Sequence, residues 1–153
     1  MVKNQIDVNV VVDGTTEASY LRSLNIANIV SVFTDADDNT VIKYCPNNNT
    51  KTNQTIVLYQ VTETQGAIFA KASAAAGSEA ENPLFTATVT AFNYNELTTP
   101  QDQILNSGMI QSMRPLYDDD GIVVGTTLKY GSWFKSIISI EEILVTDTPS
   151  SST

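Results

Sequence analysis

Three short runs of β-branched and aromatic residues lie close together in the first half of the chain. They span residues 29–33, 40–44 and 55–61. The segments between them are rich in Asp, Asn and Pro, residues that favour turns and interrupt strands. This alternation is typical of antiparallel strands joined by loops, and it predicts a mainly β fold.

Further strands are predicted on both sides of this group. Residues 6–12 alternate apolar and polar side chains and end at Asp13-Gly14, a strong hairpin signal. Residues 17–23 could return as a second strand, with a short helix as the alternative. Later strands are expected at residues 84–94, 108–113, 122–130 and 133–145, with polar loops at 95–106 and 114–120.

One α-helix is expected over residues 62–77. Thr62 and Gln65 have the spacing of a capping box, in which each side chain bonds the backbone N–H of the other residue. An alanine-rich run follows, and Gly77 stands where a helix commonly ends in a left-handed glycine. The alanines would allow the helix to pack closely on a sheet.

The order of elements in the first half returns in the second half. Ile29-Val30-Ser31-Val32 parallels Ile110-Gln111-Ser112-Met113, and the acidic segment 35–39 parallels 118–121. Lys43-Tyr44 likewise parallels Lys129-Tyr130, and Val61-Thr62-Glu63 parallels Ile140-Glu141-Glu142. Two interpretations are open, an internal duplication or the general likeness of any two β meanders.

These patterns predict a mainly β protein with one short α-helix, built from tandem small β-barrel or roll subdomains. The first subdomain is expected at residues 1–77, including the helix, and the second at 84–145. Residues 78–83 form a polar linker and residues 146–153 a flexible tail. Each subdomain is small and would bury little apolar surface alone, so contacts with partners would stabilise it.

Composition excludes several classes of function. The chain of 153 residues has no histidine and one cysteine, Cys45, which excludes a Ser-His-Asp triad, a Cys-His dyad and an intrachain disulfide. Its net charge is −9 with 8 basic residues, so neither nucleic acid nor an anionic membrane is an expected partner. The first residues also lack the basic and apolar pattern of a signal peptide.

The acidic clusters fail as metal sites. Asp35, Asp37 and Asn39 begin like a calcium-binding loop, but Thr40 stands in place of the required glycine and Pro46 in place of the closing glutamate. The 118–121 cluster lacks the first acidic ligand, so turn formation explains both clusters better. Glu141 and Glu142 are adjacent and would point to opposite faces of a strand. We therefore expect no metal, no cofactor and no enzymatic activity.

Two groups of side chains are candidates for a subunit interface. Tyr130, Trp133 and Phe134 gather aromatic surface that could stack a base or a sugar, but such groups more often form core or interface. Asn47, Asn48 and Asn49 lie in a polar loop that cannot bury apolar surface.

The pattern I-x-x-I-x-S-V, acidic turn, T-V-I-x-Y, loop, I-V-x-x-x-V-x-E-T and Ala-rich helix occupies residues 26–72. It resembles small β-barrel proteins of tailed-phage particles, and a weaker copy lies in residues 108–145. The long loop at residues 46–54 departs from the compact form of the pattern.

The resemblance implies a non-enzymatic virion structural protein, first of all a capsid decoration (cement) protein. Its partners would be the major capsid protein or other virion proteins, in repeated copies or as a homo-oligomer. It would be made in the host cytoplasm and located in the virion. The alternatives are a head-to-tail connector or tail component, or a stand-alone carbohydrate- or protein-binding β module.

Overall fold

The computed structural model describes residues 4–12, 18–46, 56–131 and 136–145. Within these residues the fold is mainly β, with ten strands hydrogen-bonded into one antiparallel sheet and one α-helix. This confirms the predicted fold class. That order is β2-β1-β5-β4-β3-β7-β6-β10-β9-β8. The elements are β1 (Gln5–Val11), β2 (Ala18–Asn25), β3 (Ile29–Thr34), β4 (Thr40–Tyr44), β5 (Val57–Val61), α1 (Gln65–Ala76), β6 (Leu84–Phe92), β7 (Asn95–Asn106), β8 (Ile110–Tyr117), β9 (Val123–Tyr130) and β10 (Ser136–Ile140), with short 3₁₀ turns η1 (Ile26–Asn28) and η2 (Ser107–Met109).

The chain forms two compact units. The first contains residues 1–86 together with 103–108, and the second contains 87–102 together with 109–153. The chain first passes from the first unit to the second after Thr86, close to the linker predicted at residues 78–83. The sequence did not predict that residues 103–108 belong to the first unit. They are the end of β7, whose earlier residues belong to the second unit.

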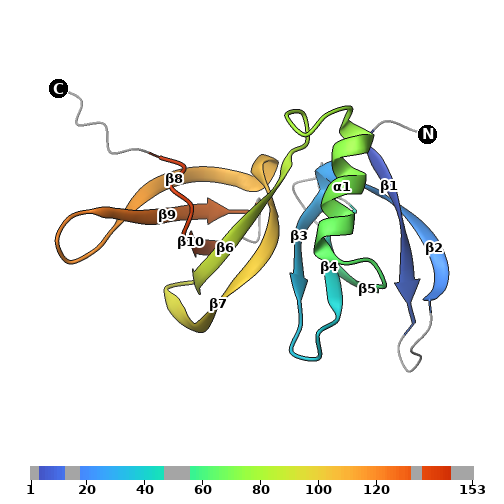
Figure 1. Ribbon diagram of the computed structural model, residues 1–153, viewed down its shortest axis with the longest axis horizontal. Helices are drawn as coiled ribbons and strands as arrows, with labels where there is room; N and C mark the ends of the chain where they lie inside the picture. The colour runs from blue at the N-terminus through green and yellow to red at the C-terminus, as the bar shows by residue number, and fades with distance from the viewer. Residues whose placement is uncertain (1–3, 13–17, 47–55, 132–135, 146–153) are drawn as a thin grey trace. The chain divides into compact units, whose positions relative to one another are not determined.

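The core of the first unit lies between its strands and α1. The helix packs against β1 and β3, as Figure 1 illustrates. Its buried face consists of Ile68 and small alanines, which let the helix approach the strands closely. Strand β1 contributes Ile6, Val8 and Val10 to this core, every second residue, as a half-buried strand requires. The cysteine, Cys45, is fully buried.

The helix begins later than the sequence predicted. Its N-cap is Thr64, whose hydroxyl accepts a hydrogen bond from the Ala67 N–H at 3.1 Å, so the capping box of Thr62 and Gln65 is wrong. The Gln65 side chain instead donates to the Thr34 hydroxyl at 2.9 Å. The helix ends as expected at Gly77, whose φ of 104° lies in the left-handed region.

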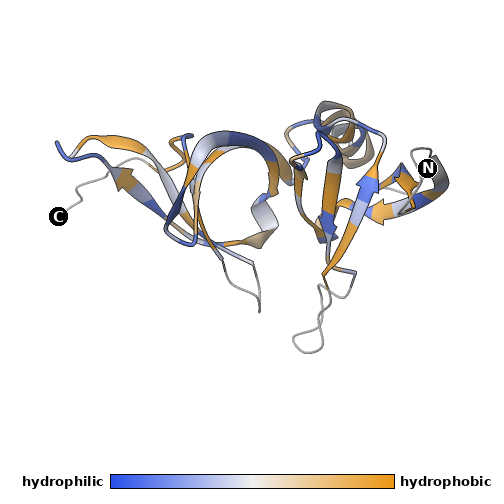
Figure 2. Cartoon of the chain, turned by 90° about the horizontal axis from the view of Figure 1, so that it is seen from below, coloured by the Kyte–Doolittle hydropathy of each residue, from blue (hydrophilic) through white to orange (hydrophobic). Residues whose placement is uncertain are grey.

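The second unit has its own buried side chains. Figure 2 shows hydrophobic segments spread along the strands rather than gathered in one element. Leu128 and Ile140 are fully buried, and Thr126 is buried with its hydroxyl bonded to the Glu142 carbonyl at 2.7 Å. The other buried apolar residues of this unit are Ala87, Val89, Ala91, Met109, Tyr130 and Ile138.

The predicted repetition of element order is confirmed at the level of strand pairing. The first five strands are ordered β2-β1-β5-β4-β3, and the last five are ordered β7-β6-β10-β9-β8. Each repeat thus places its second strand outermost, its first strand beside its fifth, and its third strand at the other end. A 3₁₀ turn precedes the third strand in both repeats.

The repeats also agree in residue register. Ser31 pairs with Lys43 after an irregularity in β3, and Ser112 pairs with Lys129 after an irregularity at the same place in β8. The predicted alignment of these segments is therefore correct residue by residue.

Two side-chain devices recur as well. The Glu63 carboxylate accepts from the backbone N–H of Asn9 at 3.0 and 3.1 Å, and the Glu142 carboxylate accepts from that of Thr88 at 2.9 and 3.1 Å. Asn25 and Asn106 each cap the following 3₁₀ turn, because their side-chain oxygens accept from the N–H two residues later. General likeness of β meanders does not account for such detail.

Two segments predicted as loops are strands. Residues 95–106 form β7, which follows a tight turn where Asn93 and Tyr94 both have positive φ. Positive φ at both central residues is the geometry of a type I′ hairpin turn. Residues 114–117, predicted as loop, extend β8 through Pro115. Most of β7 is exposed, and Pro115 and Leu116 of β8 are only half-buried, so neither segment has the apolar alternation by which strands are recognised.

Candidate functional site

Of the residues predicted to form a subunit interface, the structure describes Tyr130 alone. Tyr130 is 2% exposed, so it lies in the interior of the second unit instead of at a surface contact. Tyr130 lies in β9, between Ile110 of β8 and Ser136 of β10, and its side chain is on the buried face of the strand, opposite to that of the exposed Lys129. Trp133, Phe134, Asn47, Asn48 and Asn49 lie outside the described residues, and their role stays a prediction.

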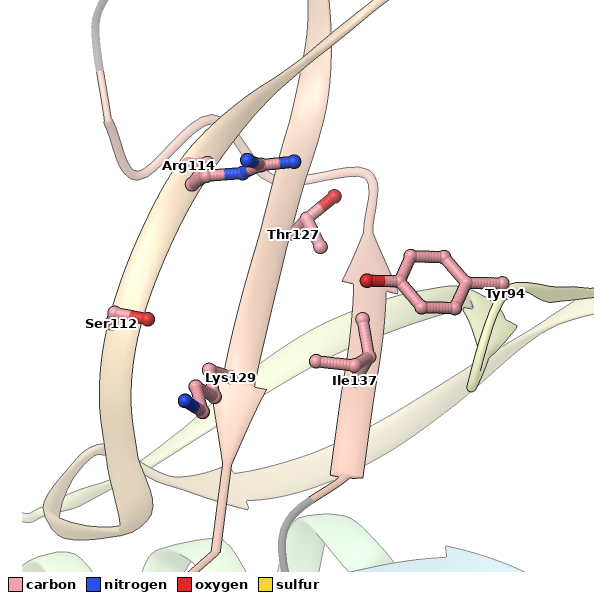
Figure 3. Close-up of a pocket in the computed structure, with 6 residues that line it drawn as sticks. All are labelled: Tyr94, Ser112, Arg114, Thr127, Lys129 and Ile137. Atoms are coloured by element: carbon pink, nitrogen blue, oxygen red, sulfur yellow. The ribbon is translucent and has the colours of Figure 1, made fainter.

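A pocket of about 310 Å³ lies on the second unit. Figure 3 shows that three neighbouring strands and the β6–β7 turn line it. Strands β8 and β9 contribute two polar pairs, and the Tyr94 ring reaches over β10 from the turn. The lining residues are Tyr94, Ser112, Arg114, Thr127, Lys129 and Ile137.

The pocket gathers positive charge on an acidic chain. The side chains of Arg114 and Lys129 are exposed, and neither side chain forms an ion pair or hydrogen bond with any residue that the structure describes. Three hydroxyls, from Tyr94, Ser112 and Thr127, line the same pocket as the two cations. A guanidinium, an ammonium and hydroxyls together suit a carboxylate, sulfate or phosphate group. Among the described residues that line the pocket there is no carboxylate and no thiol.

The equivalent face of the first unit is apolar. Register places Lys43 where Lys129 lies, but Lys43 is half-buried, and burial lowers the pKa of its ammonium. A pocket of about 500 Å³ covers part of this face. Its lining includes Leu58, 59% exposed, and Tyr20, 44% exposed. The remaining lining residues are Val10, Val11, Val12, Val41, Tyr59 and Gln60.

The acidic clusters build turns, as predicted. The Asp35 carboxylate accepts from the N–H of Asp37 at 3.0 Å and of Asn39 at 2.8 Å. The Asp118 carboxylate accepts from the N–H of Asp120 and of Ile122, both at 2.9 Å. In each turn the first aspartate is thus occupied by backbone donors, which is the usual reason for Asp in this position. Among the described residues, no group of three or more acidic or cysteine side chains could hold a metal ion.

The Glu63 carboxylate is the centre of the one ion pair in the described part of the chain. Besides Asn9, it accepts from Lys71 at 3.1 Å, and the same ammonium donates to the Asp7 carbonyl at 2.6 Å. Burial raises the pKa of this carboxyl, but the bonds from Asn9 and Lys71 and the Lys71 charge outweigh burial and lower it. This cluster joins α1 to β1 through one carboxylate and one ammonium.

Sequence reasoning missed the basic pocket because Arg114 was assigned to a loop. The signal that could have found it was the repeat itself. Aligning Lys129 with Lys43 and Ser112 with Ser31 places Lys129, Ser112 and Arg114 on adjacent strands.

Comparisons with known proteins gave no relative: no family model, no curated protein and no solved structure matches this chain. In the part of the chain described, no helix has the length and apolar character needed to span a membrane.

Proposed function

We propose that this chain is a non-enzymatic structural protein of a virus particle, with capsid decoration as its most direct role. It would be a component of the virion, bound to the major capsid protein or another virion protein. A position at the head-to-tail junction or in the tail is the closest alternative. The phage assignment rests on the resemblance in residues 26–72 and on the polar, low-charge composition.

One observation of the fold carries the structural role. The strand order ends at β2 on one side and at β8 on the other, so two strand edges are open among the described residues. Open edges can add main-chain hydrogen bonds to a neighbouring chain, and soluble monomers usually protect them. Exposed Tyr20, Leu21 and Met113 lie on these two strands, where they would be covered by such a neighbour.

The composition favours contact over solvation. Charged residues make up 16% of the chain, and much of its polar surface is Thr, Ser and Asn. Burying such side chains costs less desolvation than burying Lys or Glu. Subunits with small cores also gain stability when they bind a partner.

The test is to purify particles from an infected culture and from one in which this gene is deleted. The proposal requires the protein in stoichiometric amount in the first particles, and reduced stability or faulty assembly of the second. Mass spectrometry of the particles and their heat release of DNA measure these outcomes. A protein found as a free monomer in the lysate and absent from the particles refutes the proposal.

The basic pocket supports a second candidate, a β module that binds an acidic glycan. The probe is a uronic-acid oligosaccharide titrated into the protein while amide chemical shifts are recorded. Lys129→Ala and Arg114→Ala should each weaken binding severalfold, since each removes one cation from the pocket. Lys43→Ala is the matched control at the same position of the first repeat and should leave binding unchanged. Titration of the wild type without any shift in β8 or β9 rules this candidate out.

A further inference from the structure

The edge of β3 in the first unit is covered by residues 103–108. Ser31 pairs with Leu105 and Val32 pairs with Ile104. The Asn106 side-chain amide donates to the carbonyls of Ile26, Ala27 and Ile29 at 2.9 to 3.2 Å. All these residues belong to one unit.

The corresponding edge of the second repeat has no such cover in the described residues. Strand β8, the counterpart of β3, is the last strand of the order. Met113 is 40% exposed, whereas Val32 at the same position is fully buried. Ser112 is exposed, whereas Ser31 is buried.

The counterpart of the covering segment is also available. Residues 103–108 correspond by repeat to residues 22–27 at the end of β2, the outermost strand on the other side. Ser23 is exposed and Asn25 half-buried, whereas their counterparts Ile104 and Asn106 are buried. The Asn25 oxygen caps η1 as the Asn106 oxygen caps η2. Its amide nitrogen, however, makes no hydrogen bond to any residue that the structure describes.

We propose that β2 of a second copy of this chain pairs with β8, so that the β3–β7 pairing is repeated between copies. Leu24 of the second copy would lie opposite Ser112, and Ser23 opposite Met113. The Asn25 amide would donate to the carbonyls that follow Asn106 in η2 and at the start of β8. The inference rests on the proposed structural role and names the partner at the open edges.

The proposed contact joins two different surfaces, so each copy gives one edge and accepts one. Such a heterologous contact produces a ring or a filament, whereas a two-fold dimer would need one surface to contact itself. Pro115 lacks a backbone N–H and would limit the pairing of β8 with β2 to a short stretch. The β3–β7 pairing is similarly short, with two paired positions.

Electrostatics predicts how salt acts on this contact. The next position would bring Arg22 opposite Arg114, and the chain as a whole carries a net charge of −9. Like charges opposite one another on paired strands are destabilising. Added salt screens both effects and should therefore strengthen association.

The experiment measures the mass of the purified full-length protein by light scattering over a range of concentrations. Met113→Lys blocks the β8 edge, and Val124→Lys is its control at a similarly exposed position of β9. Asn25→Asp blocks the β2 edge, because it removes the amide donor while an oxygen remains to cap η1. Asn95→Asp, at an exposed position of β7, controls for the added charge. Circular dichroism checks that each variant is folded.

The wild type and both controls should form species larger than a dimer, while each blocked variant should be monomeric. An equal mixture of the two blocked variants should form dimers and nothing larger, because one intact β2 edge and one intact β8 edge remain. A monomeric wild type overturns the inference, and so does a two-fold dimer that both blocked variants retain. Assembly that appears only after removal of residues 146–153 also overturns it, since the tail would then be the occupant of the edge.

This outcome is separable from the particle test. A protein that is present in particles but monomeric by itself would retain its structural role and lose this contact. A protein that assembles as described but is absent from particles would do the reverse.

Discussion

Glu63 links three elements of the first unit through one carboxylate. It follows β5, accepts from Asn9 in β1 and pairs with Lys71 in α1. Because its pKa is lowered on folding, ionised Glu63 stabilises the fold above the ordinary pKa of a glutamate, about 4.5. That stabilisation is lost as the pH falls through the lowered value.

We expect Glu63→Gln to lower the free energy of unfolding by roughly 1–3 kcal/mol near neutral pH. The difference from wild type should shrink as the pH falls below the ordinary glutamate value, since protonation removes the same charge from the wild type. Denaturant titrations at several pH values measure both effects. Glu96→Gln, at an exposed position of β7, is the control and should have little effect. A difference that is constant over the acid range would contradict the argument.

Gly125 is required by a close approach between β9 and β10. A Cβ placed there would overlap the carbonyl oxygen of Ile140, which is backbone and cannot swing aside. Gly125→Ala should therefore destabilise the protein by roughly 1–3 kcal/mol, the usual cost of overpacking. Gly66→Ala is the comparison, because a Cβ meets nothing at that position in α1. It should raise stability by roughly 0.5–1 kcal/mol through helix propensity. Thermal melting of both variants measures the contrast, which equal effects would contradict.

Two threonines, Thr62 and Thr64, lie near the start of α1, and only Thr64 is its N-cap. The Thr64 hydroxyl caps the helix, whereas Thr62 lies two residues before it with its backbone N–H bonded to Asn9. Thr64→Ala should cost about 1 kcal/mol of stability, as loss of a threonine N-cap usually does. Thr62→Ala should cost much less, because the helix does not use its hydroxyl. Denaturant unfolding compares the two variants. A larger loss of stability in Thr62→Ala than in Thr64→Ala would contradict the assignment of Thr64 as the N-cap.

Elements with buried alternating faces could be predicted from sequence, and exposed ones could not. β1, β3, β4 and the end of α1 at Gly77 were predicted to within two residues. β7 was missed because its exposed residues, including Pro100, carry no apolar period. The helix start shifted because Thr62 and Thr64 both have capping chemistry, and only the contact with β1 selects between them.

At the scale of the molecule, the sequence indicated the repeat but not the assignment of residues 103–108 to the first unit. The strand register confirms that Lys43-Tyr44 and Lys129-Tyr130 occupy equivalent positions in the two repeats, as local sequence patterns already indicated. Residues 103–108 belong to the first unit, where they pair with β3 and the Asn106 amide donates to the Ile29 carbonyl. No periodicity encodes such contacts, so the covered edge of β3 could not be predicted from the sequence.

The two units have separate cores, and equivalent positions in them can be tested against each other. Ile42 in β4 and Leu128 in β9 occupy the same place in the repeats, and both are fully buried. Truncating either to alanine should cost roughly 2–5 kcal/mol. With Ile42→Ala, hydrogen exchange should quicken in the first unit, including residues 103–108, while β9 and β10 keep their protection. With Leu128→Ala, exchange should quicken in the second unit, while residues 103–108 keep theirs, because Asn106 holds them to the first. If either variant exposes all strands equally, the units unfold as one and the division at residues 103–108 has no energetic meaning.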